Sequence, residues 1–215
     1  MINFKKSYPT IIIASKDNTG IDELRHDLSS KGIYFHAADF ISAKELVSTS
    51  DVLVIISPQY SSPATALLNY IKDHAPSHEI IYAGSESDVS NQDGIRIIPA
   101  IRSSLVNEIE RTLKDKFNFD PIYAEDDEII CELVKPAQVY YNGTKLLLSK
   151  SEAKIVHFLL CVEPKHLVSK ETIGEYLDLA AGAVPVHIHN INDKSMKTYH
   201  DKLIFSRSSR GYFVY

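Results

Sequence analysis

Short apolar runs alternate with amphipathic stretches through the first half of the chain. Several of the runs are continuous in Ile and Val, which is typical of parallel strands covered on both faces. Parallel strands need crossovers, and the stretches between these runs have helical periods. The pattern predicts an α/β domain with a doubly wound, flavodoxin-like sheet. The five predicted strands are residues 10–14, 33–38, 51–57, 79–83 and 95–101.

Four helices are predicted between or after these strands. Ile21, Leu24 and Leu28 form one apolar stripe, which Gly32 ends. The last helix has the period Leu105, Ile109, Leu113, and Ser103 or Ser104 is its expected N-cap. The second and third helices are predicted around residues 43–47 and 66–71.

The pattern changes to short strands after residue 128. Strands are predicted at residues 129–134, 138–141 and 145–148, and Asn142-Gly143 predicts a tight hairpin because both residues tolerate positive φ. Ser149 and Glu152 form a capping box for a first helix. A second helix is expected after Ser169, a third over residues 183–196, and a closing hairpin over residues 203–206 and 212–215.

Residues 118–128 have no apolar period and are predicted to be a linker between two domains, 1–117 and 129–215. The acidic run that begins at Glu125 is either a solvated segment or a shield for a basic half. Residues 128–215 hold 11 Lys and Arg against 9 Asp and Glu, a net charge of +2, whereas residues 1–127 hold 12 against 19, a net charge of −7. The second half is therefore the one whose charge permits nucleic-acid binding.

Composition favours a soluble cytoplasmic protein. The 215 residues are 44% hydrophobic and 24% charged, as in globular domains, and the apolar runs are too short for a membrane span or a signal peptide. Cys131 and Cys161 do not make a disulfide framework. They are expected to be buried thiols, with redox sensing as the alternative interpretation.

The residues at the predicted strand ends do not include the groups that catalytic sites of this architecture use. The strands end in Ser15-Lys16, Phe40, Ile56-Ser57, Gly84-Ser85 and Ile98-Pro99. A glycine-rich phosphate loop, a carboxylate cluster for Mg²⁺ and a nucleophile with an evident base are all missing from this set. The sequence therefore predicts no enzyme activity, no cofactor and no metal site.

The order of elements in the first half resembles the receiver domain of response regulators. In that family an acidic pair follows the first strand, where this chain has Ser15 and Lys16. The resemblance places the family's phosphoacceptor aspartate on Ile56. It places the family's switch Thr or Ser, whose hydroxyl is used, on Gly84, and the Lys of the family's Lys-Pro pair on Ile98. A shift of the alignment by one residue restores no acid, and Asp17 alone does not make the family's pair. The resemblance therefore implies a degenerate receiver that cannot be phosphorylated on aspartate.

Only residues 86–94 separate the fourth and fifth predicted strands, so the fourth receiver helix is expected to be shortened or lost. In the family that helix contributes to the dimer face. A homodimer through this domain would therefore use a changed face.

The second half resembles the winged helix-turn-helix of OmpR/PhoB-type bacterial regulators over residues 129–215. Four segments in order carry the resemblance: 142–152, 167–171, 184–188 and Arg210-Gly211-Tyr212. The family inserts its third helix in the DNA major groove and its wing at the minor groove. The resemblance and a helical wheel together place His187, Asn190, Lys194 and Lys197 on the DNA face, with Arg207 and Arg210 at the wing.

Two departures from the family affect its implied function. The recognition helix is poor in Arg, and residues 178–182 are shorter than the loop that contacts RNA polymerase in relatives. We expect a transcription regulator that binds double-stranded promoter DNA, acts as a homodimer and contacts RNA polymerase less readily. Two alternatives stay open: a protein-interaction adaptor whose winged helix has lost DNA affinity, and a small-ligand sensor at a pocket lined by Ser15, Ser57, Gly84 and Ser85.

Overall fold

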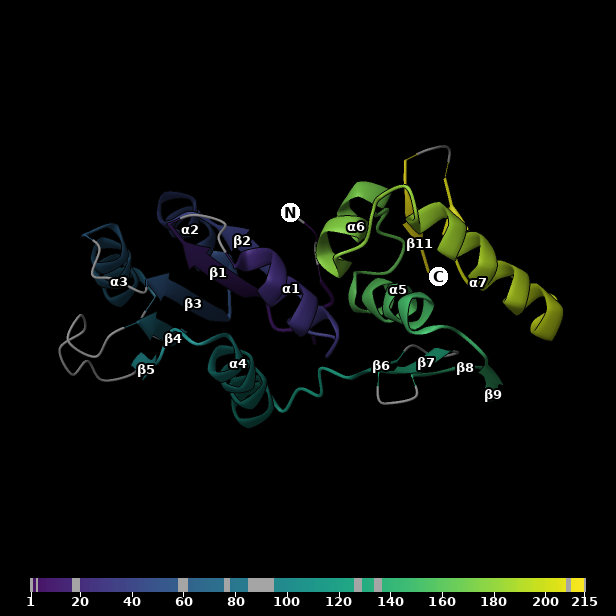
Figure 1. The fold of residues 1–215 in the computed structure, drawn as a ribbon, viewed down its shortest axis with the longest axis horizontal. Coiled ribbons are helices and arrows are strands. Elements are labelled where there is room, and N and C mark those ends of the chain that lie inside the picture. Colours follow the sequence, from purple (N-terminus) through teal and green to yellow (C-terminus); the bar gives the residue numbers. More distant parts are fainter. Residues whose placement is uncertain are drawn as a thin grey trace. The chain divides into compact units, whose positions relative to one another are not determined.

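The computed structural model describes residues 2, 4–16, 20–57, 62–75, 78–84, 95–125, 129–133, 137–207 and 210–214. Two compact units form (Figure 1). The sheet unit comprises Pro9–Leu24 and Phe35–Phe119. The C-terminal unit comprises Asp120–Tyr215 together with two earlier segments, Met1–Tyr8 and Arg25–Tyr34. The units are therefore not two consecutive stretches of chain, as the sequence-based division assumed.

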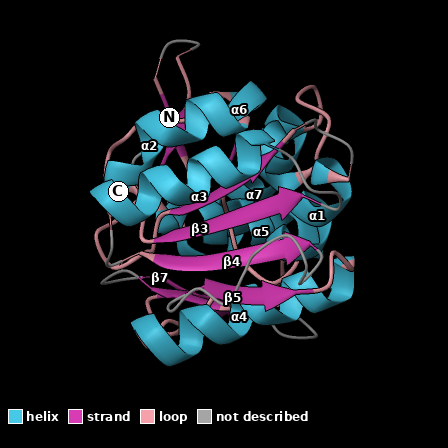
Figure 2. Ribbon diagram, turned by 90° about the vertical axis from the view of Figure 1, so that its left-hand side faces the viewer, coloured by secondary structure: helices cyan, strands magenta, loops and turns pink. Residues whose placement is uncertain are grey.

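The sheet unit contains five parallel strands in the order β2-β1-β3-β4-β5, the flavodoxin-like order predicted from the sequence. Figure 2 shows β3, β4 and β5 running side by side in one direction. Every residue of β1 is buried, as expected for a strand covered on both faces. The strands are β1 (Ile11–Ser15), β2 (His36–Ala38), β3 (Val52–Ser57), β4 (Glu79–Gly84) and β5 (Ile95–Ile98).

The helices lie where the apolar periods predicted them, with one corrected boundary. Asp39 caps α2 by accepting from the amides of Ile41 and Ser42. The last helix of the unit is capped by Ile101 without a side-chain hydrogen bond, so the expected N-cap at Ser103 or Ser104 is wrong, and both serines lie in its first turn. The helices are α1 (Ile21–Ser29), α2 (Phe40–Leu46), the 3-10 turn η1 (Val47–Thr49), α3 (Ser62–His74) and α4 (Arg102–Phe117).

Two predicted strands of the sheet unit are shorter than expected. The run over residues 33–38 forms a strand only from His36, because Ile33 and Tyr34 are buried in the C-terminal unit instead. The run over residues 95–101 ends at Ile98, since the Pro99 that follows has no amide to donate to a ladder. The prediction of a shortened fourth helix falls on residues 85–94, which lie outside the described residues.

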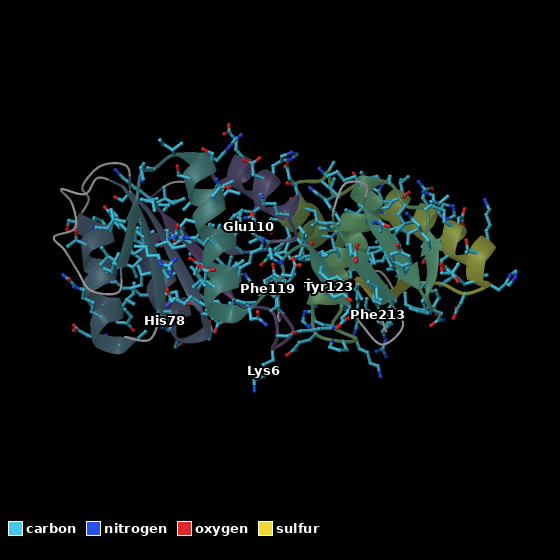
Figure 3. The ribbon with its side chains drawn as sticks, turned by 90° about the horizontal axis from the view of Figure 1, so that it is seen from below. Lys6, His78, Glu110, Phe119, Tyr123 and Phe213 are labelled. Carbon is cyan, nitrogen blue, oxygen red and sulfur yellow. The ribbon has the colours of Figure 1, made fainter. Side chains whose placement is uncertain are left out.

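A four-stranded antiparallel sheet opens the main part of the C-terminal unit. Its order is β6-β7-β8-β9, and Asn142 and Gly143 connect the last two strands with φ of 49° and 75°, as their sequence predicted. The first strand was not predicted: β6 begins at Tyr123, four residues after Phe119, inside the expected linker (Figure 3). The strands are β6 (Tyr123–Glu125), β7 (Ile129–Glu132), β8 (Gln138–Tyr141) and β9 (Thr144–Leu146).

Three helices and a hairpin follow this sheet. Ser149 and Glu152 form the predicted capping box at the start of the first helix, and the Ser169 hydroxyl accepts from the Thr172 amide at the start of the second. Pro185 lies in the first turn of the third, where a missing amide costs little. The elements are α5 (Lys150–Cys161), α6 (Lys170–Leu177), α7 (Val184–Tyr199), β10 (Phe205–Ser206) and β11 (Tyr212–Phe213).

Residues near the N-terminus complete the core of the C-terminal unit. Phe4 forms a β-bridge with Val162, and the Lys5 amide donates to the Cys161 carbonyl at 2.8 Å. The Tyr8 hydroxyl donates to the Gly32 carbonyl at 3.1 Å and accepts from the Tyr34 amide. Five aromatic rings stack or meet edge to face in this core: Phe4, Tyr8, Tyr34, Phe158 and Tyr176.

A buried polar pair lies at the centre of this core. The Tyr34 hydroxyl is 2.8 Å from His157 Nδ1, and both residues are at most 1% exposed. Burial lowers the pKa of His157 to about 3, and the Pro121 carbonyl opposes part of this shift. The imidazole is therefore neutral at physiological pH, and the pair brings no charge into the core.

Gly32 is predicted to be essential to this packing. It has a φ of +75°, and a Cβ atom there would collide with the Pro121 carbonyl oxygen and the His157 ring. Gly143 has the same φ with nothing within 4 Å, so it is the matched control. We expect Gly143→Ala to lower the free energy of unfolding by about 1–2 kcal/mol, the cost of a left-handed residue. Gly32→Ala should cost roughly 1–3 kcal/mol more because of overpacking.

Urea unfolding of the two full-length variants measures the difference. Equal losses of stability in Gly32→Ala and Gly143→Ala would show that residues 25–34 do not pack tightly against the C-terminal half.

Candidate nucleic-acid interface

Helix α7 presents one buried and one exposed stripe. Val184, Ile188, Ile191 and Ser195 are at most 5% exposed and face the core of the C-terminal unit. The opposite stripe, at the 3–4-residue spacing of a helix face, is polar apart from its first residue. It contains the exposed residues Val186, Asn190, Asp193 and Lys197.

The structure places the four predicted α7 contacts in two groups. Asn190 and Lys197 lie on the exposed stripe, whereas His187 and Lys194 flank it and are half-buried. The wheel placed all four residues on one face, but it could not show which of them meet another element.

Lys194 meets such an element. Its Nζ lies 2.6 Å from Oε2 of Glu152, whose side chain is 4% exposed. The same carboxylate oxygen accepts from the Ser149 amide at 2.6 Å in the capping box of α5. Burial raises the pKa of Glu152, but the hydrogen bonds from Lys194 and Ser149 outweigh it, so the pKa lies below its ordinary value. Lys194 therefore joins α7 to the start of α5, which is a structural role.

The C-terminal hairpin carries the two predicted arginines. Arg207 and Arg210 are exposed on either side of its turn, where the Arg207 amide donates to the Gly211 carbonyl and the Arg210 amide to the Arg207 carbonyl. β10 and β11 pair through Phe205 with Phe213 and Ser206 with Tyr212.

The hairpin is also tied to the segment before α6. The Val168 amide donates to the Tyr212 carbonyl at 2.9 Å, and the Tyr212 amide donates back at 2.8 Å. Gly211, with a φ of +146°, lies so close that a Cβ atom would be 2.5 Å from the Val168 carbonyl oxygen. Glycine is required there by both the backbone conformation and the close approach.

The predicted degenerate pocket lies at the carboxyl edge of the parallel sheet. Ser15 ends β1 beside Ile56, Ser57 ends β3 beside Gly84, and Ile98 ends β5. Lys16 is exposed immediately after β1. None of these residues is a carboxylate, and Asp17 and Ser85 lie outside the described residues.

Packing explains why position 84 has no hydroxyl. A Cβ atom on Gly84 would lie 2.5 Å from the Ser57 carbonyl oxygen and 2.5 Å from a ring carbon of Tyr82. A serine or threonine at this position would need the neighbouring strand to move, so the switch hydroxyl of the resemblance has no space here.

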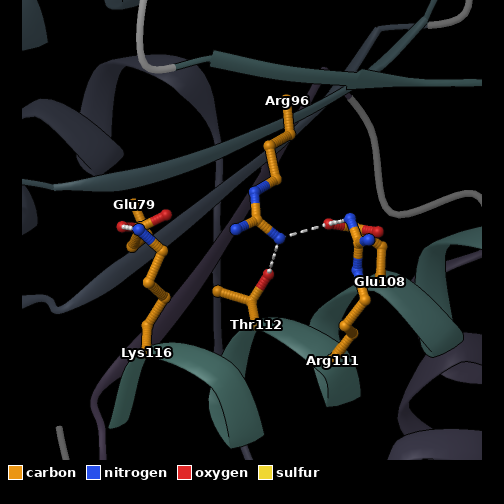
Figure 4. Close-up of polar contacts among 6 residues, drawn as sticks. All are labelled: Glu79, Arg96, Glu108, Arg111, Thr112 and Lys116. Atoms are coloured by element: carbon orange, nitrogen blue, oxygen red, sulfur yellow. Dashed lines mark hydrogen bonds and ion pairs between the residues drawn. The ribbon is translucent and has the colours of Figure 1, made fainter.

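Charged side chains on β5 and α4 pair with one another (Figure 4). Arg96 Nη1 lies 2.8 Å from Glu108 Oε1, which also accepts from Arg111 at 2.7 Å. Burial raises the pKa of Glu108, but these two guanidinium groups outweigh it and the pKa is lowered. Lys116 Nζ lies 3.0 Å from Glu79 Oε1 on β4. The ion pairs of Glu108 with Arg96 and of Lys116 with Glu79 therefore join α4 to the sheet.

The described part of the chain offers neither a metal-binding cluster nor a membrane-spanning helix. Its His, Cys, Asp and Glu side chains form no group of three that could hold a metal ion. Among its helices, none combines the length and the apolarity needed to cross a membrane.

Sequence reasoning missed two features of the candidate interface. It did not place Val186 or Asp193 on the exposed stripe, although the same wheel contains the signal. It also did not find that Asn192 bonds to the backbone of Ile204, for which the sequence offers no local signal, since the partner is 12 residues away.

Comparison with known proteins gives similarity of structure only. No family profile matches the chain, and no curated protein matches it. Among solved structures it is similar to the response regulator DrrB, an OmpR/PhoB homolog of Thermotoga maritima, at 17% identity over 95% of this chain and 98% of that one, with a TM-score of 0.37.

Two mutants of RitR match at 12% identity over 96% of this chain and 99% of theirs, with TM-scores of 0.37. A putative pilus assembly-related protein of Burkholderia pseudomallei matches at 12% identity over 50% of this chain and 91% of its own, with a TM-score of 0.36. At these identities and TM-scores the likeness carries no argument about function, which therefore has to rest on the residues described above.

The role of Lys194 can be tested against Lys197 on the same helix. Lys194→Ala would leave the buried Glu152 carboxylate without its ammonium partner, so we expect the free energy of unfolding to fall by about 1–2 kcal/mol. Lys197→Ala should change it by less than about 0.5 kcal/mol, as for exposed positions. Urea unfolding at pH 7 measures both. Equal stability of the two variants would contradict a structural role for the Lys194–Glu152 ion pair, and Lys194 would then be available to contact DNA.

Proposed function

We propose that this chain is a sequence-specific DNA-binding transcription regulator whose C-terminal unit is a winged helix-turn-helix. The observation that carries the proposal is the exposed stripe of α7, which lies in the same unit as a hairpin with two exposed arginines. In this interpretation α6, the turn and α7 form the helix-turn-helix, α7 is the recognition helix, and β10–β11 is the wing.

Each side chain has a role suited to its chemistry. Asn190 can bind adenine through two hydrogen bonds, and Val186 can contact a thymine methyl group. Lys197 and His187 would contact phosphates or bases at the two ends of α7. Arg207 and Arg210 would contact phosphates or the minor groove. Most of the charge-dependent affinity then comes from the hairpin, because Lys194 is engaged by Glu152.

The proposed regulator acts without aspartyl phosphorylation. The described strand ends Ser15, Ile56 and Gly84 supply neither the acceptor carboxylate nor the switch hydroxyl of a receiver, and position 84 is sterically closed to a hydroxyl. The proposal assigns no catalytic reaction and no cofactor to the chain.

A homodimer through the sheet unit would let two α7 helices read two half-sites. Any such face has to accommodate the ion pairs of β5 and α4, whose charges already have partners within the chain. RNA polymerase is a further proposed partner, and the short α6–α7 connection limits the surface available for it. The reducing cytoplasm is the proposed location.

An adaptor that binds protein rather than DNA is the second candidate function. Two observations favour it: the exposed stripe of α7 contains Asp193, and the only lysine midway along the helix, Lys194, is ion-paired with Glu152. Both reduce the positive charge that a duplex would meet.

The DNA-binding proposal predicts a specific loss on substitution of α7. Fluorescence anisotropy of full-length protein with promoter DNA and with random duplex should show tighter promoter binding. Asn190→Ala should lose about 1–3 kcal/mol of that discrimination, the value of one bidentate base contact. Asn69→Ala, an exposed asparagine of α3, is the matched control and should bind like the parent.

Equal, weak binding of both duplexes by the parent chain, unchanged in Asn190→Ala, would contradict DNA reading and favour the adaptor.

Phosphorylation independence predicts no response to a small phosphodonor. After incubation with acetyl phosphate and Mg²⁺, the intact mass and the affinity for promoter DNA should stay unchanged, because the described strand ends offer no aspartate. Intact-protein mass spectrometry and the anisotropy titration are the measurements. An added phosphoryl mass that disappears in Asp17→Asn would show that this one nearby carboxylate accepts phosphate after all.

A further inference from the structure

The segment between α7 and the hairpin is held by two side chains of α7. Asn192 Nδ2 donates to the Ile204 carbonyl at 2.7 Å, and the Ile204 amide donates to Asn192 Oδ1 at 2.9 Å. One helical turn later, the Ser195 hydroxyl donates to the Asp201 carbonyl at 2.8 Å. Asn192 is half-buried and Ser195 is buried, so neither belongs to the exposed stripe.

A carboxamide is well suited to this contact. It offers one donor group and one acceptor in a fixed plane, and Asn192 uses them to satisfy both backbone groups of a single residue. Ile204 is 1% exposed, so without Asn192 its amide and carbonyl would lose these partners in a place with little access to water. Asparagine is otherwise unfavourable in a helix interior, so a role in tertiary bonding is a physical reason for its presence.

These two bonds fix the position of the residue that directly precedes the hairpin. Ile204 directly precedes β10, and Arg207 directly follows it. At the opposite strand, Tyr212 is tied to Val168 by the paired backbone hydrogen bonds described above. The hairpin is thus held at two points, by Asn192 on α7 and by Val168 before α6.

We propose that Asn192 is a positioning residue for DNA binding: it fixes Arg207 and Arg210 relative to the exposed stripe of α7, so that helix and hairpin bind one duplex together. The inference rests on the proposed DNA-binding function and adds a residue that touches no DNA itself. A hairpin already held in place loses less conformational freedom on binding, which preserves the affinity gained from its arginines.

Asn190 and Asn192 then have separable effects. Asn190 is exposed, so its loss should reduce base discrimination and leave the salt dependence of binding unchanged. Loss of Asn192 should reduce the salt dependence, because the hairpin arginines no longer neutralise phosphates in a fixed place, while discrimination through Asn190 persists.

The first experiment is a binding cycle on full-length protein. Promoter affinity is measured by anisotropy across a KCl series for the parent, Asn192→Ala, the double variant Arg207→Ala/Arg210→Ala and the combined triple variant. We expect the slope of log K against log salt to become shallower by about 2 in the double variant, roughly one for each arginine. Asn192→Ala should show a similar slope, and the triple variant should lose nothing more.

Two results of this cycle would overturn the inference. One is a parent-like salt slope in Asn192→Ala, which would leave the residue a purely structural role. The other is an additive loss in the triple variant, which would mean that the arginines bind equally well without Asn192. Asn192→Asp keeps the acceptor for the Ile204 amide and loses the donor, so we expect an intermediate slope.

The second experiment needs no DNA. Spin labels on Lys197→Cys and Arg207→Cys report the distance between α7 and the hairpin; Cys131 and Cys161 are buried and poorly accessible to the label. We expect a narrow distance distribution that broadens on Asn192→Ala. It should not broaden on Thr198→Ala, whose hydroxyl donates to the Lys194 carbonyl of the same helix.

The two experiments separate the two proposals. An unchanged distribution in Asn192→Ala overturns the positioning role even if the parent binds DNA. A parent that binds no duplex at any salt concentration overturns the DNA-binding function, and with it the role of Asn192 in that function, even if the distribution broadens.

Discussion

The C-terminal unit depends on a core that its own half of the chain does not complete. Phe4, Tyr8 and Tyr34 come from the first 34 residues, and they pack with Phe158 and Tyr176 around the Tyr34–His157 pair. Buried aromatic residues of this size contribute much of the apolar area that a small domain can bury. Folding of the proposed DNA-binding unit is therefore tied to segments that precede the parallel sheet and interrupt it.

This packing also restricts the surrounding backbone. Gly32 has no space for a side chain beside Pro121 and His157, and the Tyr34 hydroxyl lies within hydrogen-bonding distance of the buried, neutral imidazole. Helix α1 has its first residues in the sheet unit and its later ones, from Arg25, in the C-terminal unit. The chain therefore passes from one unit to the other several times.

The sequence predicted what depends on local pattern. Strand β8 and the Asn142-Gly143 turn were found because alternation and positive φ are properties of a few adjacent residues. The strand β6 was missed because three residues with one buried side chain show no period. The apolar run that begins at Ile33 predicts a strand too early, since apolar character does not reveal which core a residue enters.

In the candidate site, too, the sequence predicted the features that depend on local spacing and missed those that depend on distant partners. The helical wheel found the stripe with Asn190 and Lys197, because orientation around a helix follows from spacing. It could not find the ion pair of Lys194 with Glu152, which joins residues 42 apart. Such contacts become visible only when the packing of α5, α6 and α7 is known.

Several polar side chains of α7 bond to other parts of the protein. Lys194 bonds to α5, and Asn192 and Ser195 bond to the segment before the hairpin, so the positions that point outward retain only one lysine and no arginine. If this unit binds DNA, the phosphate charge has to be met mainly by Arg207 and Arg210. Affinity then depends on how firmly the hairpin is held, and specificity depends on the few side chains of the exposed stripe. Because these internal bonds reduce the positive charge that α7 offers to a duplex, the proposed function depends more on the hairpin and on Asn192, which anchors it.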